Sequence, residues 1–172
     1  MRMSLVILST IAACLGASYC DVRTRRIPNV LTGSLALGAL VVHAAFGLWP
    51  LAECFAVMAV LTAGGTLLYA RGGIGAGDIK LAIAGSGMLS FPLCVTFLLY
   101  TAISGGVLAL LFMIVRANAR TMLSRAVYMT LAGTPGITTD KREKMPYAVA
   151  FALGAILVAL SQSIAPFLRI NI

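Results

Sequence analysis

Long apolar stretches separated by short polar segments dominate this chain. Six of them are candidate helices, covering about residues 3–20, 30–47, 51–70, 79–90, 92–115 and 147–169. A helix needs roughly 20 apolar residues to cross the hydrocarbon core of a membrane. The pattern therefore predicts an all-α polytopic membrane protein with about six transmembrane helices. The fourth stretch is the shortest and is rich in Gly and Ala, and Pro92 separates it from the fifth.

Composition supports the same class. The chain has 172 residues, of which 60% are hydrophobic and 10% are charged, whereas soluble domains contain about 25% charged residues. We therefore expect one membrane-embedded domain over residues 1–172. The first stretch is longer than the apolar core of a signal peptide, so we expect it to be retained. The net charge is +8, but in a membrane protein excess Lys and Arg report orientation, and no nucleic-acid partner is expected.

The positive charges alternate along the chain. Eleven of the thirteen Lys and Arg residues lie in three segments, 21–29, 71–80 and 116–146, whereas the segments near 48–50 and 90–91 carry none. Cytoplasmic loops are enriched in Lys and Arg, so we expect these three segments to be cytoplasmic and both termini to be periplasmic. Within the longest segment, residues 117–132 mix Arg with apolar side chains, which predicts an interfacial amphipathic helix.

Only five acidic residues are present, and two of them stand out. Asp140 and Glu143 lie in a basic loop, where solvated charge is the ordinary role, and Glu53 begins the third stretch as an interfacial residue. Asp21 and Asp78 instead lie at the cytoplasmic edges of apolar helices, where ionisable groups are functional candidates. The structural alternatives are a loop carboxylate paired with the nearby arginines for Asp21, and a helix N-cap for Asp78.

The surroundings of the two aspartates differ. After Asp21, Pro28 favours an extended Ile27, and Asn29 is expected to cap the second helix. Asp78 directly follows a glycine-rich run at 72–77. Because glycine has no side chain, a substrate strand can approach the backbone of this run closely. This run does not fit a phosphate-binding loop, because an Asp follows the last Gly where that loop has a Lys.

The two aspartates have the same predicted side and similar depth. Packed helices lie about 8–10 Å apart, so the carboxylates can meet. Two close carboxylates do not both ionise easily, and such a pair supports peptide hydrolysis, with one activating water and the other protonating the carbonyl. His43 is the only histidine and is predicted near the opposite side. A Ser-His triad, a metal site and a cofactor are therefore not expected.

Two motifs then carry a family resemblance. Asp21 shortly before Ile27-Pro28-Asn29, followed after further spans by Gly75-Ala76-Gly77-Asp78-Ile79-Lys80, resembles the type IV prepilin peptidases. The Gly-x-Gly-Asp core is shared with presenilin-like intramembrane proteases, but the joint occurrence is specific. Pro146-Tyr147-Ala148 also resembles the family, and the resemblance covers residues 1–169. It implies that Asp21 and Asp78 are the catalytic pair of an aspartic endopeptidase.

The resemblance also implies a substrate class. Longer members of the family add paired C-x-x-C motifs and a methyltransferase domain, and this sequence has neither. It resembles the short, peptidase-only members associated with tight-adherence (Flp-type) pili. The implied substrate is a prepilin with a short basic leader, cut at the cytoplasmic face of the bacterial inner membrane. Further expected partners are membrane lipids and the pilus-assembly machinery.

The roles of the remaining motif residues stay open at this stage. We expect the site to be shaped by Gly75, Gly77, Pro28 and Asn29. Lys80 either tunes Asp78 or extends to the membrane interface. The candidates for contact with substrate are Pro146 and Tyr147, and the alternative for Tyr147 is an anchor at the membrane interface.

Helix dipoles favour Asp78 as base and Asp21 as acid, whereas the arginines near Asp21 favour the reverse. The functional alternative is a small ion- or proton-coupled transporter, or a pilus-assembly subunit, with non-catalytic aspartates.

Overall fold

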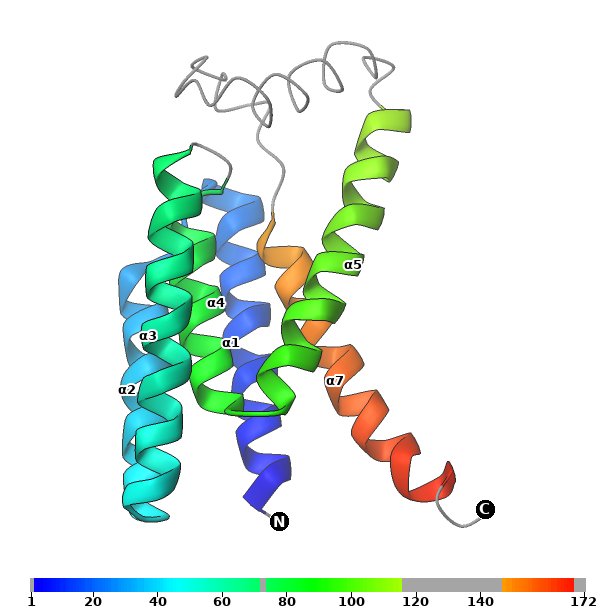
Figure 1. The fold of residues 1–172 in the computed structure, drawn as a ribbon. Helices are drawn as coiled ribbons and strands as arrows, with labels where there is room; N and C mark the ends of the chain where they lie inside the picture. The colour runs from blue at the N-terminus through cyan, green and yellow to red at the C-terminus, as the bar shows by residue number, and fades with distance from the viewer. Residues whose placement is uncertain (1, 72–73, 116–146, 169–172) are drawn as a thin grey trace.

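The chain folds into a bundle of six described helices, shown by a computed structural model (Figure 1). The structure describes residues 2–71, 74–115 and 147–168. The helices are α1 (Arg2–Thr24), α2 (Asn29–Ala45), α3 (Leu48–Ala70), α4 (Ala76–Leu89), α5 (Leu93–Val115) and α7 (Ala148–Leu168). Each of the six predicted stretches corresponds to one of them. The predicted amphipathic helix at 117–132 lies outside the described residues.

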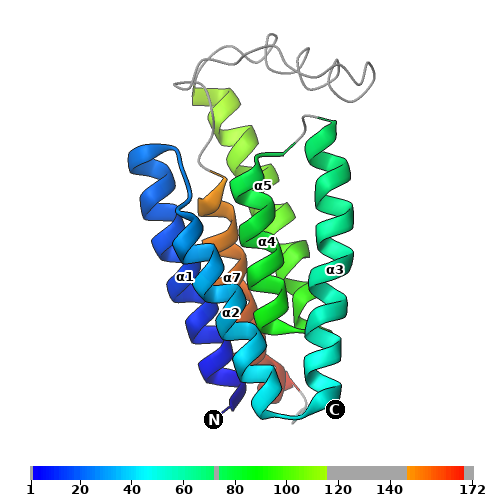
Figure 2. The same cartoon turned by 90° about the vertical axis from the view of Figure 1, so that its left-hand side faces the viewer.

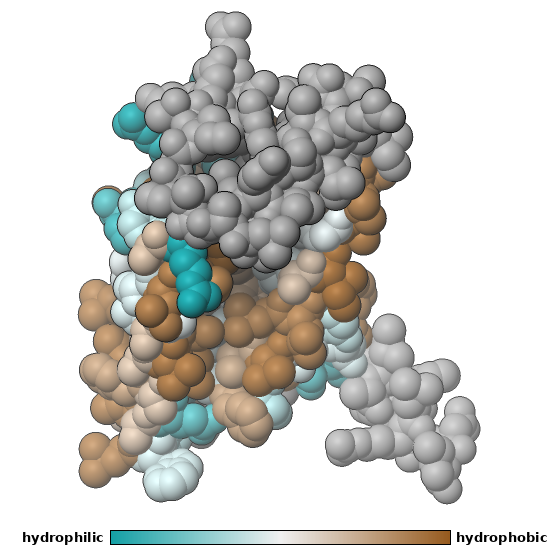
Figure 3. Space-filling view, turned by 45° about the horizontal axis from the view of Figure 1, so that its top comes forward, coloured by the Kyte–Doolittle hydropathy of each residue, from teal (hydrophilic) through white to brown (hydrophobic). Residues whose placement is uncertain are grey.

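Three of the described helices are long and apolar enough to cross a membrane. They are residues Ser4–Thr24, Leu48–Ala70 and Leu93–Leu111, and Asn29–Ala45 and Ala148–Ser163 are shorter apolar helices. Large apolar side chains cover the outside of the bundle, as Figure 3 shows along its flank; examples are Leu8, Leu37, Val60, Leu99 and Ile103. A water-exposed bundle would expose polar residues there, so the fold agrees with the predicted membrane class.

The short helix α4 lies at the centre of the bundle and packs against all five other described helices. Its 14 residues span about 21 Å, less than the roughly 30 Å of a hydrocarbon core. Its residues 84–89 are all buried. A helix surrounded by protein does not have to present an apolar surface to lipid, which explains how a sequence rich in Gly and Ala occupies this place.

The other helices divide into two groups around α4. On one side α2 and α3 pack together, and on the other α5 packs against α7, which also packs against α1 (Figures 1 and 2). Within the described chain, α3 and α5 do not pack against each other. The described chain begins and ends at the same end of the bundle (Figure 1), and the assignment of that end to the periplasm stays a prediction.

Candidate active site

Asp21 lies in the last turn of α1, at the end of the bundle opposite the termini. The helix ends at Thr24, because Arg25 adopts the left-handed conformation (φ 54°) while its N–H still donates to the Asp21 carbonyl at 2.8 Å. The Asp21 side chain is partly buried. Of the neighbouring arginines, Arg23 donates from Nη1 to the Tyr19 hydroxyl at 2.9 Å.

The start of α7 is held against the last turns of α1. Ser18 Oγ donates to the carbonyl oxygen of Ala148 at 2.8 Å, and the N–H of Ala148 donates to Asp21 Oδ2 at 3.4 Å. A helix N-terminus carries unpaired N–H groups and a partial positive charge. Asp21 therefore lies in the last turn of α1 and also beside the N-terminus of α7.

Asp78 lies in the first turn of α4, with its carboxylate close to Gly75. The N-cap of α4 is Gly75 and no side chain caps it, so the N-cap alternative for Asp78 is wrong. A Cβ added at Gly75 would lie 3.0 Å from Asp78 Oδ2. Because Gly75 has an ordinary extended backbone (φ −71°, ψ 143°), glycine here leaves room for the carboxylate and is not needed for a special turn.

The two sequence motifs contact each other directly. A Cβ added at Gly77 would lie 3.4 Å from Ile27, and Lys80 Nζ donates to Asn29 Oδ1 at 2.9 Å. The expectation that Asn29 caps α2 is wrong: the N-cap is Pro28, without a side-chain hydrogen bond. The helix begins one residue earlier than a cap at Asn29 requires, so the Asn29 amide is free to accept from α4.

The contacts between the motifs bring the two carboxylates together. Asp21 lies close enough to Asp78 for their charges to interact. The carboxylates come from helices whose sequence positions are more than fifty residues apart, and no local sequence pattern sets their separation. The motif contacts, together with the hydrogen bond from α7, supply the geometry that the sequence alone left open.

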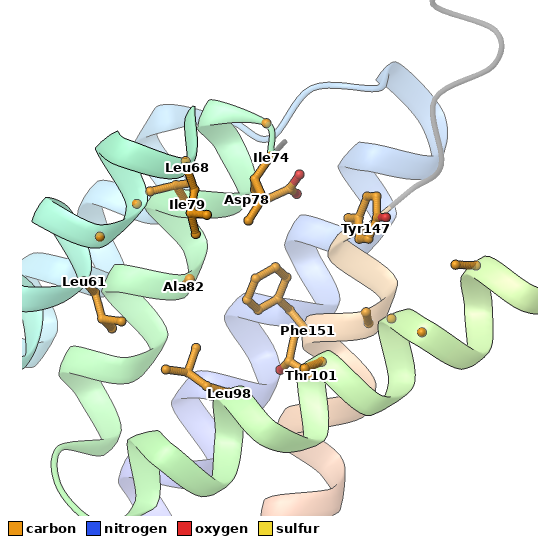
Figure 4. Close-up of a pocket in the computed structure, with 18 residues that line it drawn as sticks. Leu61, Leu68, Ile74, Asp78, Ile79, Ala82, Leu98, Thr101, Tyr147 and Phe151 are labelled. Atoms are coloured by element: carbon orange, nitrogen blue, oxygen red, sulfur yellow. The ribbon is translucent and has the colours of Figure 1, made fainter. Parts of the chain in front are cut away.

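A pocket of about 560 Å³ opens beside Asp78, between α3 and α4 on one side and α5 and α7 on the other. Gly75 and Tyr147 line the same pocket, and Tyr147 is 48% exposed. Figure 4 shows the Asp78 carboxylate and the Tyr147 ring near one end of it. Of the two candidates at the start of the last span, Tyr147 thus lies at the site, and Pro146 lies outside the described residues.

Three contributors to this region were not identified from the sequence. Ser18 and Phe151 look like ordinary helix residues, and Thr101 lies within an apolar run. Ser18 fixes the start of α7, whereas Phe151 and Thr101 line the pocket. Their positions depend on how α1, α5 and α7 pack, so no motif or spacing in the sequence could have found them.

Comparison with known families supports the two-motif interpretation. The family model described as the type IV leader peptidase family matches residues 8–110, a range that contains Asp21, Asp78 and the segment between them. Searches of curated proteins and of solved structures gave no match. Ala148 of α7, which donates to Asp21, lies beyond the matched range. Because the match covers more than half of the chain, this protein belongs to the type IV leader peptidase family.

Proposed function

We propose that this protein is a membrane-embedded aspartic endopeptidase that removes the short basic leader of Flp-type prepilins, with Asp21 and Asp78 as its catalytic pair. One observation carries the proposal. Two carboxylates, one from each motif, lie close enough for their charges to interact at one end of the bundle, and one of them, Asp78, lines a pocket. A family of leader peptidases supplies the reaction class, and the paired carboxylates supply groups able to perform it.

The proposed reaction needs one ionised and one protonated carboxyl group. The ionised group takes a proton from water, and the water oxygen attacks the carbonyl carbon of the scissile bond. The protonated group gives its proton to the carbonyl oxygen, which yields a tetrahedral diol. When the C–N bond breaks, the carboxyl group that now carries the proton gives it to the leaving nitrogen, and a diol hydroxyl gives its proton to the other carboxylate as the carbonyl re-forms, so the pair again holds one proton.

The structure changes the argument about which aspartate is the base. Helix dipoles favoured Asp78, because it lies at the start of α4 whereas Asp21 lies at the end of α1. Asp21, however, also accepts the first N–H of α7. Each carboxylate therefore has a helix N-terminus beside it, and the dipoles no longer distinguish the two roles.

The side of the membrane on which cleavage is proposed follows from the position of the two aspartates in the bundle. Asp21 belongs to segment 21–29 and Asp78 to segment 71–80, and the distribution of Lys and Arg assigns both segments to the cytoplasm. Cleavage would then occur at the cytoplasmic boundary of the bacterial inner membrane. The transporter alternative is less well supported, because transporters bind their ions near the middle of the membrane, whereas both carboxylates here lie at one end.

Cleavage of an Flp-type prepilin in liposomes tests the proposal. We expect the wild type to cut at the leader boundary. Asp21→Asn and Asp78→Asn should each lower kcat by roughly 10²–10⁴-fold, the range for loss of a general acid or base. The double variant should lose little more, because groups that act as a unit are not additive.

The rate should also fall at both low and high pH, since the reaction needs one proton on the pair. Unfolding midpoints serve as the control for folding. Full activity in either single variant would refute the catalytic pair. If the folded wild type cuts no prepilin, the ion-transport alternative is tested next by flux assays.

A further inference from the structure

The hydroxyl of Ser18 bonds differently from other hydroxyls of α1. Ser9 and Thr10 both donate to the Val6 carbonyl, at 2.8 and 2.9 Å. Bonds of this kind, to a carbonyl three or four residues earlier, are the ordinary ones for hydroxyls inside helices. Ser18 Oγ instead donates to the Ala148 carbonyl on α7, at 2.8 Å. Its hydroxyl therefore connects two helices that are far apart in the sequence.

Within the part of the chain that the structure describes, both hydrogen bonds between α1 and α7 involve Ala148. Its carbonyl accepts from Ser18, and its N–H donates to Asp21 Oδ2 at 3.4 Å. Ser18 and Asp21 are three residues apart on α1 and so share a face of that helix. At 3.4 Å the bond to Asp21 is longer than an ordinary N–H···O bond. The shorter bond from Ser18 is therefore the one that holds Ala148 in place.

Ala148 is fully buried and is the first residue of α7. The N–H of a first helical residue has no acceptor in its own helix, and a buried N–H without a partner is costly. Apolar packing against α1 and α5 holds the body of α7, but such packing is not directional. The bond from Ser18 is directional, and it aims the Ala148 N–H at the Asp21 carboxylate.

The start of α7 also adjoins the second aspartate. Tyr147, which directly precedes Ala148, lines the pocket together with Asp78. Figure 4 shows the Tyr147 ring and the Asp78 carboxylate near the same end of that pocket. A shift of the first turn of α7 would therefore change the surroundings of both carboxylates.

We propose that Ser18 is a positioning residue of the peptidase: by holding the Ala148 carbonyl, it keeps the Ala148 N–H on Asp21 and so fixes the orientation of that carboxylate. The inference rests on the proposed function, in which Asp21 is one of the catalytic pair. Ser18 does not line the pocket, so it acts through Ala148 and not on the substrate. Small displacements of a reacting group are costly to the rate.

Ser18→Ala tests the proposal, with Ser9→Ala as its matched control. Both serines are half-buried on α1 and donate at 2.8 Å, but the bond of Ser9 stays within its own helix. We expect Ser18→Ala to lower kcat for prepilin cleavage by roughly tenfold and to leave KM near the wild-type value. Ser9→Ala should change neither constant. Ser18→Thr keeps the hydroxyl and should recover most of the lost rate.

Amide hydrogen exchange gives a second measurement that does not need activity. In Ser18→Ala the peptide that covers the start of α7 should exchange faster than in the wild type, because local opening of that turn becomes easier. The same peptide in Ser9→Ala should exchange at the wild-type rate. Unfolding midpoints of both variants show whether the comparison is made at equal folding.

The two measurements separate the inference from the proposed function. If Ser18→Ala keeps the wild-type kcat, or if Ser9→Ala loses as much, Ser18 is not a positioning residue. A higher KM at unchanged kcat would also overturn the inference, because the contact would then serve substrate binding. If the wild type cuts no prepilin while exchange at the start of α7 rises only in Ser18→Ala, the hold on Asp21 stands and the peptidase proposal fails.

Discussion

The two ends of the bundle use polar side chains in opposite ways. At the end where the described chain begins and ends, His43 bonds through Nδ1 to the Ala39 carbonyl at 2.7 Å and through Nε2 to Ser90 Oγ at 2.8 Å. Beside them, Glu53 Oε1 accepts the N–H of Phe91 at 3.0 Å. These groups satisfy one another across α2, α3 and the turn that follows α4.

At the other end, the acidic side chains instead lie beside a pocket. The Asp21 and Asp78 carboxylates lie close enough for their charges to interact, and Asp78 lines an apolar pocket. The helix α4 connects the two ends, with Asp78 in its first turn and Ser90 as its C-cap. Polar residues of one helix therefore form hydrogen bonds across the bundle at one end, and line the pocket at which we propose the chemistry at the other. The two ends differ less in residue type than in whether their polar side chains hydrogen-bond to one another across helices.

The largest effect expected from this difference is on stability at the end that contains His43. His43→Ala removes the shorter of the two hydrogen bonds of the buried Ser90 hydroxyl, which also donates to the Gly87 carbonyl at 3.3 Å, and should lower the free energy of unfolding by roughly 1–3 kcal/mol. Activity per folded molecule should stay close to that of the wild type, because the site is at the other end. Thermal unfolding in detergent measures the first quantity and cleavage at matched folded concentration the second.

Val41→Ala is the control for His43→Ala, since Val41 is on the same helix and 61% exposed. We expect it to change the unfolding midpoint far less. A His43→Ala protein that stays fully stable but loses activity would reverse the roles assigned to the two ends.

A smaller effect, now on activity, is expected at the aspartate end. In Gly75→Ala the new methyl would lie 3.0 Å from Asp78 Oδ2 and must displace the carboxylate. Because small displacements of reacting groups are costly, kcat should fall by roughly tenfold. The backbone angles suit Ala, so the loss of stability should stay near the ~1 kcal/mol of a poorer N-cap. Steady-state cleavage and thermal unfolding together check this.

Gly77→Ala is the matched variant for Gly75→Ala. Its methyl would meet Ile27 at 3.4 Å, an ordinary contact, and it lies away from the carboxylate. We expect kcat to remain near the wild-type value. Equal losses of kcat in the two variants would show that kcat depends on the backbone of segment 75–77 and not on the position of the Asp78 carboxylate.

The smallest effect is expected at the link between the two motifs. Lys80→Met removes the hydrogen bond to Asn29 and should cost at most about 1 kcal/mol of stability, because both residues are exposed. Asn29→Ala should cost a similar amount, and the double variant little more. The pH–rate profile should not move in Lys80→Met. A clear shift of that profile would instead support the alternative in which Lys80 tunes Asp78.

Much of the architecture could be predicted from the sequence. Apolar stretches of the right length indicated six helices, and Pro92 marked the break between α4 and α5. The scarcity of acidic residues drew attention to Asp21 and Asp78, since an ionisable group at the edge of an apolar helix is costly without a purpose. These inferences rest on the composition of each stretch, which needs no knowledge of its neighbours.

The capping prediction for Asn29 and the capping alternative for Asp78 are wrong for the same reason. Asn29 and Asp78 are residue types that commonly cap helices, and each follows a natural helix start, yet neither caps its helix. In the folded protein a polar side chain can bond to any group that packing brings near it. The Asn29 side chain accepts a hydrogen bond from Lys80, fifty-one residues away in the sequence. A local preference of roughly 1 kcal/mol is no larger than such a contact, so it does not by itself decide where the helix begins.

The sequence by itself determined the membrane class, the six helices and the two carboxylates, because hydrophobic length and the cost of isolated charge are properties of each segment alone. Only the tertiary structure decided that α7 donates a hydrogen bond to Asp21, that α4 lies at the centre, and that Thr101 and Phe151 line the pocket beside Asp78. Those features depend on which helices pack together. Helix packing follows from shape complementarity between surfaces that the sequence encodes only jointly.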